Sequence, residues 1–171
     1  MQQREIYLAG GCFWGVQKYL DAIPGVLSTE VGYANGDRAT ISYPEVKTGL
    51  TGHAETVRVR FDAEVISLTA LLSLFFDAID PLSHDRQGGD IGHQYRTGVY
   101  YADETLLPEI RSAEAALTAA LGQTSAVEFL PLSQYCAAED YHQDYLAKNP
   151  DGYCHIGPDT MARLKKRIAS L

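Results

Sequence analysis

The chain has 171 residues, 46% of them hydrophobic, and a formal net charge of −8 at pH 7. This length suits one ordinary domain with a real hydrophobic core, and the composition is typical of a globular protein rather than a disordered one. The acidic balance disfavours nucleic acids and anionic membranes as partners, because such partners are bound by basic surfaces.

Predicted strands and helices alternate in the first half of the chain. Strands are indicated by runs in which apolar residues alternate with polar ones, and helices by apolar residues three or four positions apart. Pro24-Gly25 ends the first helix, and Asn35-Gly36 marks a turn. The elements expected here are strands over 4–9, 26–33 and 53–61, a helix from Phe13 to Ile23, and a long loop over 35–52.

The second half continues the alternation. Ser67 is a good N-terminal cap for a helix whose apolar face runs from Leu68 to Ile79. The polar, glycine-rich segment over 84–96 reads as a loop. The remaining elements expected are a strand over 97–101, a helix over 104–121, a last strand over 126–130, and helices over 138–147 and 159–169. This pattern predicts an α/β or α+β sandwich with a small mixed sheet.

No segment of the chain reads as a targeting or membrane-spanning sequence. The N-terminus lacks a basic segment followed by a long apolar run, and no stretch of about 18 apolar residues occurs. We therefore expect a cytoplasmic protein that acts as a monomer, since nothing in the sequence demands an oligomer. Thiols are kept reduced in the cytoplasm, and the three cysteines are too few for a disulfide scaffold.

Cys12 lies where the first strand is expected to end and the first helix to begin. The preceding Gly10 and Gly11 allow unusual backbone angles and leave space near the sulfur. A thiol at a helix N-terminus meets free backbone N–H groups and the positive end of the helix dipole, so we expect a lowered pKa and a nucleophilic thiolate. The alternative is a buried cysteine that only packs. The adjacent Phe13 and Trp14 would give a small apolar substrate group, such as a methyl, an aromatic wall.

The segment Gly10–Gly15, GGCFWG, resembles the signature of the A-type peptide methionine sulfoxide reductases. Further matches follow in family order over nearly the whole chain: Tyr43, GHAE at 52–55, RQGGDIGHQYR at 86–96, AEDYHQDYL at 138–146 and NPDGYC at 149–154. The resemblance implies reduction of methionine S-sulfoxide, in proteins or as the free amino acid, in the repair of oxidative damage. It also implies a single domain over 1–171: a two-layer sandwich with a ferredoxin-like core flanked by helices and a long C-terminal coil and helix.

The resemblance assigns roles to individual residues. Glu55 is implied as the acid that protonates the sulfoxide oxygen, for which burial must keep its carboxyl protonated. Tyr43 and Tyr95 are implied as donors to that oxygen, and Asp90 as a carboxylate of the site. Without the resemblance, Glu55 would be read as an exposed strand residue, Asp90 as a turn residue, and either tyrosine as structural.

The same resemblance implies a second cysteine in the cycle. Attack by Cys12 leaves a sulfenic acid, which Cys154 would convert to a redox-active disulfide. Thioredoxin or a similar dithiol would then reduce that disulfide. No metal, flavin or nicotinamide is needed.

Two positions depart from the family pattern, and the C-terminal tail lacks a feature that some relatives carry. Gly89 stands where asparagine is usual, and Cys136 where an aromatic residue is usual. Cys136 is interpreted either as inert packing or as an auxiliary thiol. The segment after Cys154 carries no further cysteine, which favours a cycle of two cysteines.

Three other functions are compatible with parts of the sequence. A Cys/His hydrolase or acyltransferase would use Cys12 with His53 or His142 as its base. A zinc module would use Cys136, His142, Cys154 and His155, although these lack the close cysteine pairs of structural zinc sites. A redox-sensing protein would form the disulfide without turnover.

Overall fold

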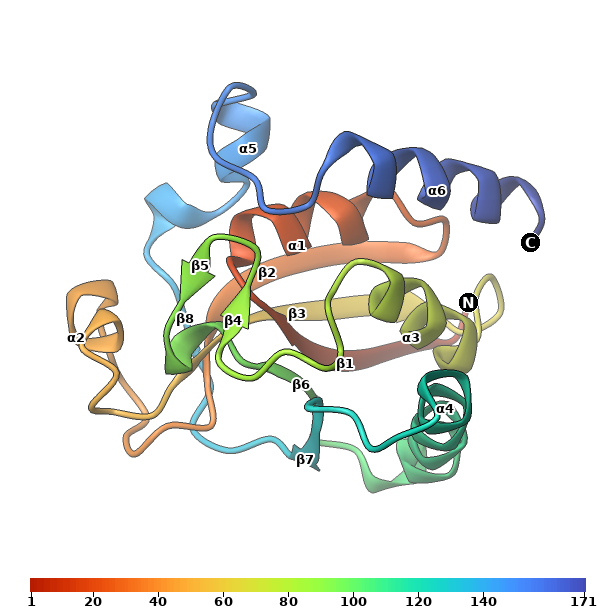
Figure 1. The fold of residues 1–171 in the computed structure, drawn as a ribbon, viewed down its shortest axis with the longest axis horizontal. Helices are drawn as coiled ribbons and strands as arrows, with labels where there is room; N and C mark the ends of the chain where they lie inside the picture. Colours follow the sequence, from red (N-terminus) through yellow and green to blue (C-terminus); the bar gives the residue numbers. More distant parts are fainter.

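The computed structural model describes residues 1–171 and is built around a six-stranded sheet with strand order β7-β6-β1-β3-β2-β8 (Figure 1). A two-stranded sheet, β4-β5, lies beside it. The strands are β1 (Gln3–Gly10), β2 (Val26–Ala34), β3 (Ala54–Asp62), β4 (Arg86–Gln87), β5 (Asp90–Ile91), β6 (Thr97–Tyr101), β7 (Glu128–Pro131) and β8 (Cys136–Ala137). The helices are α1 (Phe13–Asp21), α2 (Tyr43–Lys47), α3 (Leu68–Asp77), α4 (Leu107–Leu121), α5 (Tyr145–Lys148) and α6 (Pro158–Ala169), with short 3₁₀ turns η1 (His93–Tyr95), η2 (Glu104–Leu106) and η3 (Asp140–His142).

Four strands and two helices form the expected ferredoxin-like core. The neighbours β6-β1, β1-β3 and β3-β2 all pair antiparallel, while α1 connects β1 to β2 and α3 lies between β3 and β6. This is the β-α-β-β-α-β arrangement. Only β6 and β7 pair in parallel, so the sheet is mixed, as predicted.

The two faces of the sheet are covered differently. On β3, Val57, Val59 and Phe61 are fully buried in a core of 32 residues that also includes apolar side chains of α1, α3, α4 and α6. The opposite face carries a small cluster around Tyr7 and Tyr100. It also carries ion pairs between strands, such as those of Arg58 and Arg60 with Glu5. The result is a two-layer sandwich, because the helices pack on one face.

Most predicted elements are confirmed, with shifts of one or two residues at their ends. The cap at Ser67 is present, since its Oγ accepts the backbone N–H of Ala70 at 3.1 Å. The expected loop over 35–52 was wrong at α2, where Pro44 occupies the first turn and favours helix initiation. The expected loop over 84–96 contains the β4-β5 hairpin and η1.

The strand predicted over 126–130 is β7, but it is not the last strand, because β8 follows it. The predicted helix over 138–147 was wrong in its middle. Asp144 has a positive φ of 53° and separates η3 from α5. The Gln143 side chain bonds both the N–H and the carbonyl of Val31, at 2.9 and 2.8 Å. These contacts to β2 outweigh the helical preference of the segment.

None of the helices is both long enough and apolar enough to cross a lipid bilayer.

Candidate active site

Cys12 occupies the junction between β1 and α1, as the sequence indicated. Gly11 has a φ of +91°, and a Cβ there would lie 2.6 Å from the Gln87 Cβ, so both the backbone and the space require glycine. Cys12 is the N-cap of α1, and the backbone N–H groups of Trp14 and Gly15 face its sulfur. The side chain is only 7% exposed, and none of the larger cavities of the molecule is lined by it.

The expected lowering of the Cys12 pKa was wrong for the resting protein. Burial raises the pKa of the thiol above its ordinary value, and the nearby Glu55 and Asp90 raise it further. The N–H groups of Trp14 and Gly15 act in the opposite direction but do not outweigh burial. Cys12 therefore rests as a thiol, and its thiolate must be stabilised by what enters the site.

Glu55 lies on β3 with its carboxyl directed at the first turn of α1. Its Oε1 accepts the Phe13 N–H at 3.2 Å, and its Oε2 accepts the Gln94 Nε2–H at 2.9 Å. Burial raises the pKa of Glu55 from 4.5 to about 7, while the donors from Gln94 and Phe13 hold it down. At neutral pH the carboxyl is thus poised between its acid and its base form, as general acid catalysis requires.

Two tyrosine hydroxyls and one carboxylate complete the polar part of the site. Tyr43 and Tyr95 both lie near Glu55, and burial raises the pKa of both, so both hydroxyls keep their protons and can donate. Asp90 lies on β5, where its negative charge raises the pKa of Cys12 and of the neighbouring Tyr153. Its Oδ2 is buried without a hydrogen-bond partner.

The aromatic wall is held by residues that the sequence analysis did not single out for this task. Trp14 stacks on Tyr145 with ring centroids 3.8 Å apart, and its Nε1–H bonds His142 Nδ1 at 3.1 Å. Phe13 is 1% exposed and packs in the core against Tyr33 and His142. Trp14 thus faces the site more openly than Phe13, which mainly supports it.

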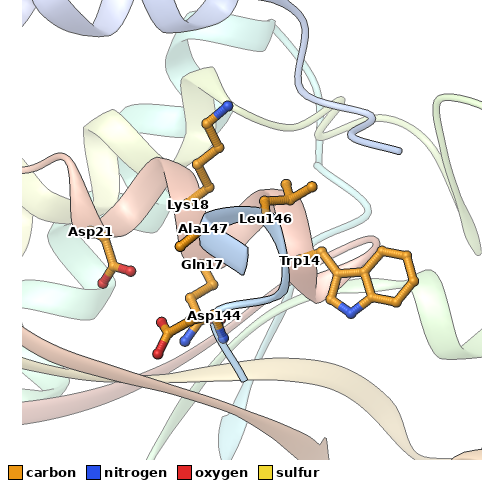
Figure 2. Close-up of a pocket in the computed structure, with 7 residues that line it drawn as sticks. All are labelled: Trp14, Gln17, Lys18, Asp21, Asp144, Leu146 and Ala147. Atoms are coloured by element: carbon orange, nitrogen blue, oxygen red, sulfur yellow. The ribbon is translucent and has the colours of Figure 1, made fainter. Parts of the chain in front are cut away.

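Trp14 also borders a cleft between α1 and α5 (Figure 2). The cavity has a volume of about 260 Å³ and is lined by Trp14, Gln17, Lys18, Asp21, Asp144, Leu146 and Ala147. Figure 2 shows the indole at one end of the cleft and the two carboxylates away from it. Neither Cys12 nor Glu55 lines this cavity, so it is separate from the chemistry at the sulfur.

Cys154 lies against the first turn of α1, close to the nucleophile in space although 142 positions later in the chain. A Cβ added to Gly15 would lie 3.0 Å from the Cys154 Sγ. All three cysteines are free thiols in this state. Cys136 lies elsewhere, on β8, with its Sγ 3.4 Å from the Ala137 carbonyl oxygen.

The rival sites are not assembled. Both ring nitrogens of His53 are engaged, by Thr51 at 2.9 Å and by the Arg38 carbonyl at 2.8 Å, so this histidine does not serve Cys12 as a base. His142 Nδ1 is engaged by Trp14. No three His, Cys, Asp or Glu side chains are grouped as metal ligands, so the geometry does not favour a zinc module.

Gln94, Glu139 and Tyr145 contact residues of the site but were not assigned a role in it from the sequence. The Glu139 carboxylate accepts the Tyr33 hydroxyl at 3.0 Å and the Tyr43 backbone N–H at 3.4 Å, which ties α2 to the site. Gln94 and Glu139 lie inside the motifs over 86–96 and 138–146, so the signal was present. The motifs did not show which group each of these side chains bonds.

Comparison with known proteins shows the family of the chain. The family model of peptide methionine sulfoxide reductase matches residues 4–170. The peptide methionine sulfoxide reductase MsrA of Lachnoclostridium phytofermentans is 50% identical over 90% of this chain and 93% of its own length. That of Clostridium perfringens is 49% identical over 91% of this chain and 99% of its own length.

Solved structures also resemble the fold of this chain. Mxr1 from Saccharomyces cerevisiae in reduced form has a TM-score of 0.82 and 36% identity, with coverage of 90% of this chain and 89% of the yeast chain. Methionine sulfoxide reductase A of Corynebacterium diphtheriae has a TM-score of 0.78 and 36% identity, with coverage of 89% and 77%. Mxr1 in complex with Trx2 shares the fold at a TM-score of 0.60 and 22% identity, with coverage of 84% and 85%. With a family model that spans nearly every residue and relatives at half identity, this chain belongs to the peptide methionine sulfoxide reductase family.

Proposed function

We propose that this member of the family reduces methionine S-sulfoxide at Cys12, with Glu55 as the proton donor and Cys154 as the resolving thiol. The observation that carries the proposal is the Glu55 carboxyl, which is buried, fixed at both oxygens beside Cys12, and has a pKa of about 7. A sulfoxide is a poor electrophile until its oxygen accepts a proton or strong hydrogen bonds. The site supplies such donors opposite a nucleophile.

In the first step the substrate sulfur meets Cys12 while its oxygen faces the donors. The hydroxyls of Tyr43 and Tyr95 bond the oxygen, and Glu55 protonates it as negative charge develops there. The Cys12 sulfur takes the oxygen and becomes a sulfenic acid, and the substrate leaves as methionine. The balance closes, because the thiol and the sulfoxide become a sulfenic acid and a thioether.

The raised pKa of the Cys12 thiol fits this sequence. A thiolate beside an ionised Glu55 would place two negative charges in a buried site. A bound sulfoxide eases that conflict, since protonation of its oxygen makes its sulfur strongly positive and this charge offsets both the thiolate and the Glu55 carboxylate. Cys12 would then be activated only when substrate is present, which protects it from oxidation between turnovers.

In the second step Cys154 attacks the sulfenic sulfur and forms a disulfide with release of water. Thioredoxin or a similar dithiol then restores both thiols by exchange. The yeast relative Mxr1 has been solved bound to Trx2, which supports thioredoxin as the reductant here. Substrates are oxidised proteins or free methionine sulfoxide.

We also propose that the whole of 1–171 acts as one reductase domain, as a monomer in the cytoplasm. The continuous core and the family match over 4–170 support a single domain. The acidic charge supports a protein that binds neither membranes nor nucleic acids.

The test is methionine formation from each separated sulfoxide epimer, with thioredoxin and its reductase as the electron source. We expect product from the S epimer only, and an intramolecular disulfide between Cys12 and Cys154 after one turnover without reductant. Equal turnover of both epimers, or a turnover that leaves all cysteines as thiols, would contradict the proposal.

A further inference from the structure

His155 follows the resolving cysteine and packs against the turn that carries the nucleophile, and the mechanism above gives it no role. Its Nε2 lies 2.9 Å from the Gly10 carbonyl oxygen at the end of β1. The position of a Cβ on Gly15 would be 3.0 Å from the Cys154 Sγ and 3.3 Å from the His155 Nδ1. The thiol and the ring nitrogen therefore converge on one point, just above the first turn of α1.

The hydrogen bond to Gly10 fixes the tautomer of this imidazole. A backbone carbonyl only accepts, so Nε2 must carry the hydrogen. Nδ1 then holds a free lone pair in the neutral ring. This Nδ1 is buried and has no hydrogen-bond partner. An unsatisfied buried acceptor carries a free-energy cost, and only a few such groups occur in a folded protein.

The neighbouring thiol needs a base before it can attack. The Cys154 Sγ lies 3.2 Å from the Ile156 carbonyl oxygen, to which it donates its proton. A carbonyl holds that proton but cannot accept it in reaction. The free Nδ1 of His155 is the basic group on the same side of α1.

The charged surroundings of His155 suit a base that becomes positive only briefly. Burial lowers the pKa of the ring, and the carboxylate of Asp90 on β5 acts against that lowering. Cys154 and Tyr153 also lie near the ring, and both are uncharged at neutral pH in their thiol and phenol forms. The ring is thus neutral at rest, and Asp90 stabilises its cation once a proton arrives.

We propose that His155 is the general base of disulfide formation, an inference that rests on Cys154 being the resolving thiol. Nδ1 removes the thiol proton as the Cys154 sulfur attacks the sulfenic sulfur of Cys12. The S–S bond forms, the S–O bond breaks, and the departing hydroxide takes the proton from Nδ1 and leaves as water. No further oxidant or reductant enters the step.

The test separates the two steps in a single turnover of the full chain with methionine S-sulfoxide and no reductant. His155→Gln can keep a donor near Gly10 but removes the base, and His84→Gln, an exposed histidine, is the matched control. We expect the methionine burst to be unchanged in both variants. Disulfide formation should slow roughly 100-fold in His155→Gln alone, a typical effect of a lost general base. The sulfenic acid should accumulate and be trapped by a cyclic 1,3-dione.

Two readouts distinguish a base from a merely structural residue. In His155→Ala, added imidazole should restore disulfide formation at least several-fold, with saturation. In the wild type the rate of disulfide formation should fall as the pH drops through the His155 pKa, because the base becomes protonated. In the variants this rate should instead follow the fraction of Cys154 that is ionised to thiolate. Disulfide formation at the wild-type rate in His155→Gln, or slow formation without imidazole rescue and with an unchanged pH profile, would overturn the role of His155.

A separate variant tests whether Cys154 is the resolving thiol, on which the role of His155 depends. If Cys154→Ser still forms an intramolecular disulfide with Cys12, the resolving thiol is Cys136 and the proposed cycle fails. That result is read from the mass of the linked peptides and does not depend on any His155 variant.

Discussion

Gly10–Gly15 and Asp151–Ile156 lie against each other and carry the two thiols, but they are built in opposite ways. The first joins a central strand to a helix, and Cys12 is 7% exposed there. The second is coil between α5 and α6, and Cys154 is only partly buried. A nucleophile aimed at one substrate atom needs a fixed position, whereas a thiol that must approach a second sulfur and then meet another protein needs freedom to move.

The difference also appears in what holds each segment. Cys12 is positioned by β-sheet hydrogen bonds, by the turn at Gly11 and by Glu55 on the neighbouring strand. Cys154 is held near α1 by packing of its neighbour Ile156 into the core and by the bond from His155 to Gly10, with no sheet hydrogen bonds around it. Changes in the first region should therefore affect the chemical step, and changes in the second should affect recycling.

The largest effect is expected at the fixed thiol. Cys12→Ser should lower methionine formation from the S-sulfoxide by roughly 10⁴-fold or more, since a hydroxyl cannot replace a sulfur nucleophile that accepts an oxygen. Cys136→Ser is the matched control, and it should keep wild-type turnover. Substantial turnover by Cys12→Ser in the thioredoxin assay would remove Cys12 from the centre of the mechanism.

The resolving thiol should separate the two half-reactions. Cys154→Ser should release about one methionine per enzyme at the wild-type rate and then stall with thioredoxin, because the sulfenic acid is not resolved. Rapid-quench measurement of the burst, followed by the steady-state rate, checks both parts. Full thioredoxin-driven cycling in this variant would make Cys136 the resolving residue.

A smaller loss is expected when the acid is altered but the nucleophile is kept. Glu55→Gln retains a hydrogen-bond donor and should lose roughly 10²-fold in the burst rate, and Glu55→Ala, which retains none, should lose more. In the wild type the burst should decline as the pH rises above about 7, where Glu55 gives up its proton. Equal losses in the two variants would argue against proton donation.

Much of this arrangement was readable in the sequence, and the limits have physical causes. Alternating and helical periodicities indicated the core strands and α1, α3, α4 and α6, because burial on one face determines them. The broken helix over 138–147 was not foreseeable, since Gln143 bonds β2, more than a hundred residues earlier. The motifs named Cys12, Glu55 and Cys154 as one site, and in the structure Glu55 and Cys154 both lie against the first turn of α1, while their catalytic roles remain predictions. The pKa of Cys12 was misjudged, because burial depends on the tertiary structure and the helix N-terminus alone does not decide it.

The buried carboxyl of Glu55 should also make the free energy of unfolding depend on pH. Its pKa is about 4.5 when unfolded and about 7 when folded, so the folded state binds more protons between these values. The contribution of Glu55 to the free energy of unfolding is complete below its unfolded pKa. It is lost as the pH rises through its folded pKa, by about 3 kcal/mol at most. Urea unfolding at pH 5 and pH 8 should show this decline in the wild type and a smaller one in Glu55→Gln. An identical pH dependence in both proteins would place the Glu55 pKa near its ordinary value.

The smallest effect is expected at Gln94, which bonds the acid. Its side-chain amide donates to the Glu55 Oε2 at 2.9 Å and so stabilises the carboxylate. Gln94→Met keeps a similar volume but removes the donor, so the pKa of Glu55 should rise and the decline of the burst rate should move to higher pH by about one unit. Gln123→Met, at an exposed position, is the control. A decline that stays near pH 7 in Gln94→Met, with the fold intact by circular dichroism, would mean that Gln94 only fills space. Because the expected shift keeps the acid protonated over a wider range, Gln94→Met should outpace the wild type above pH 8, a gain that a damaged site would not show.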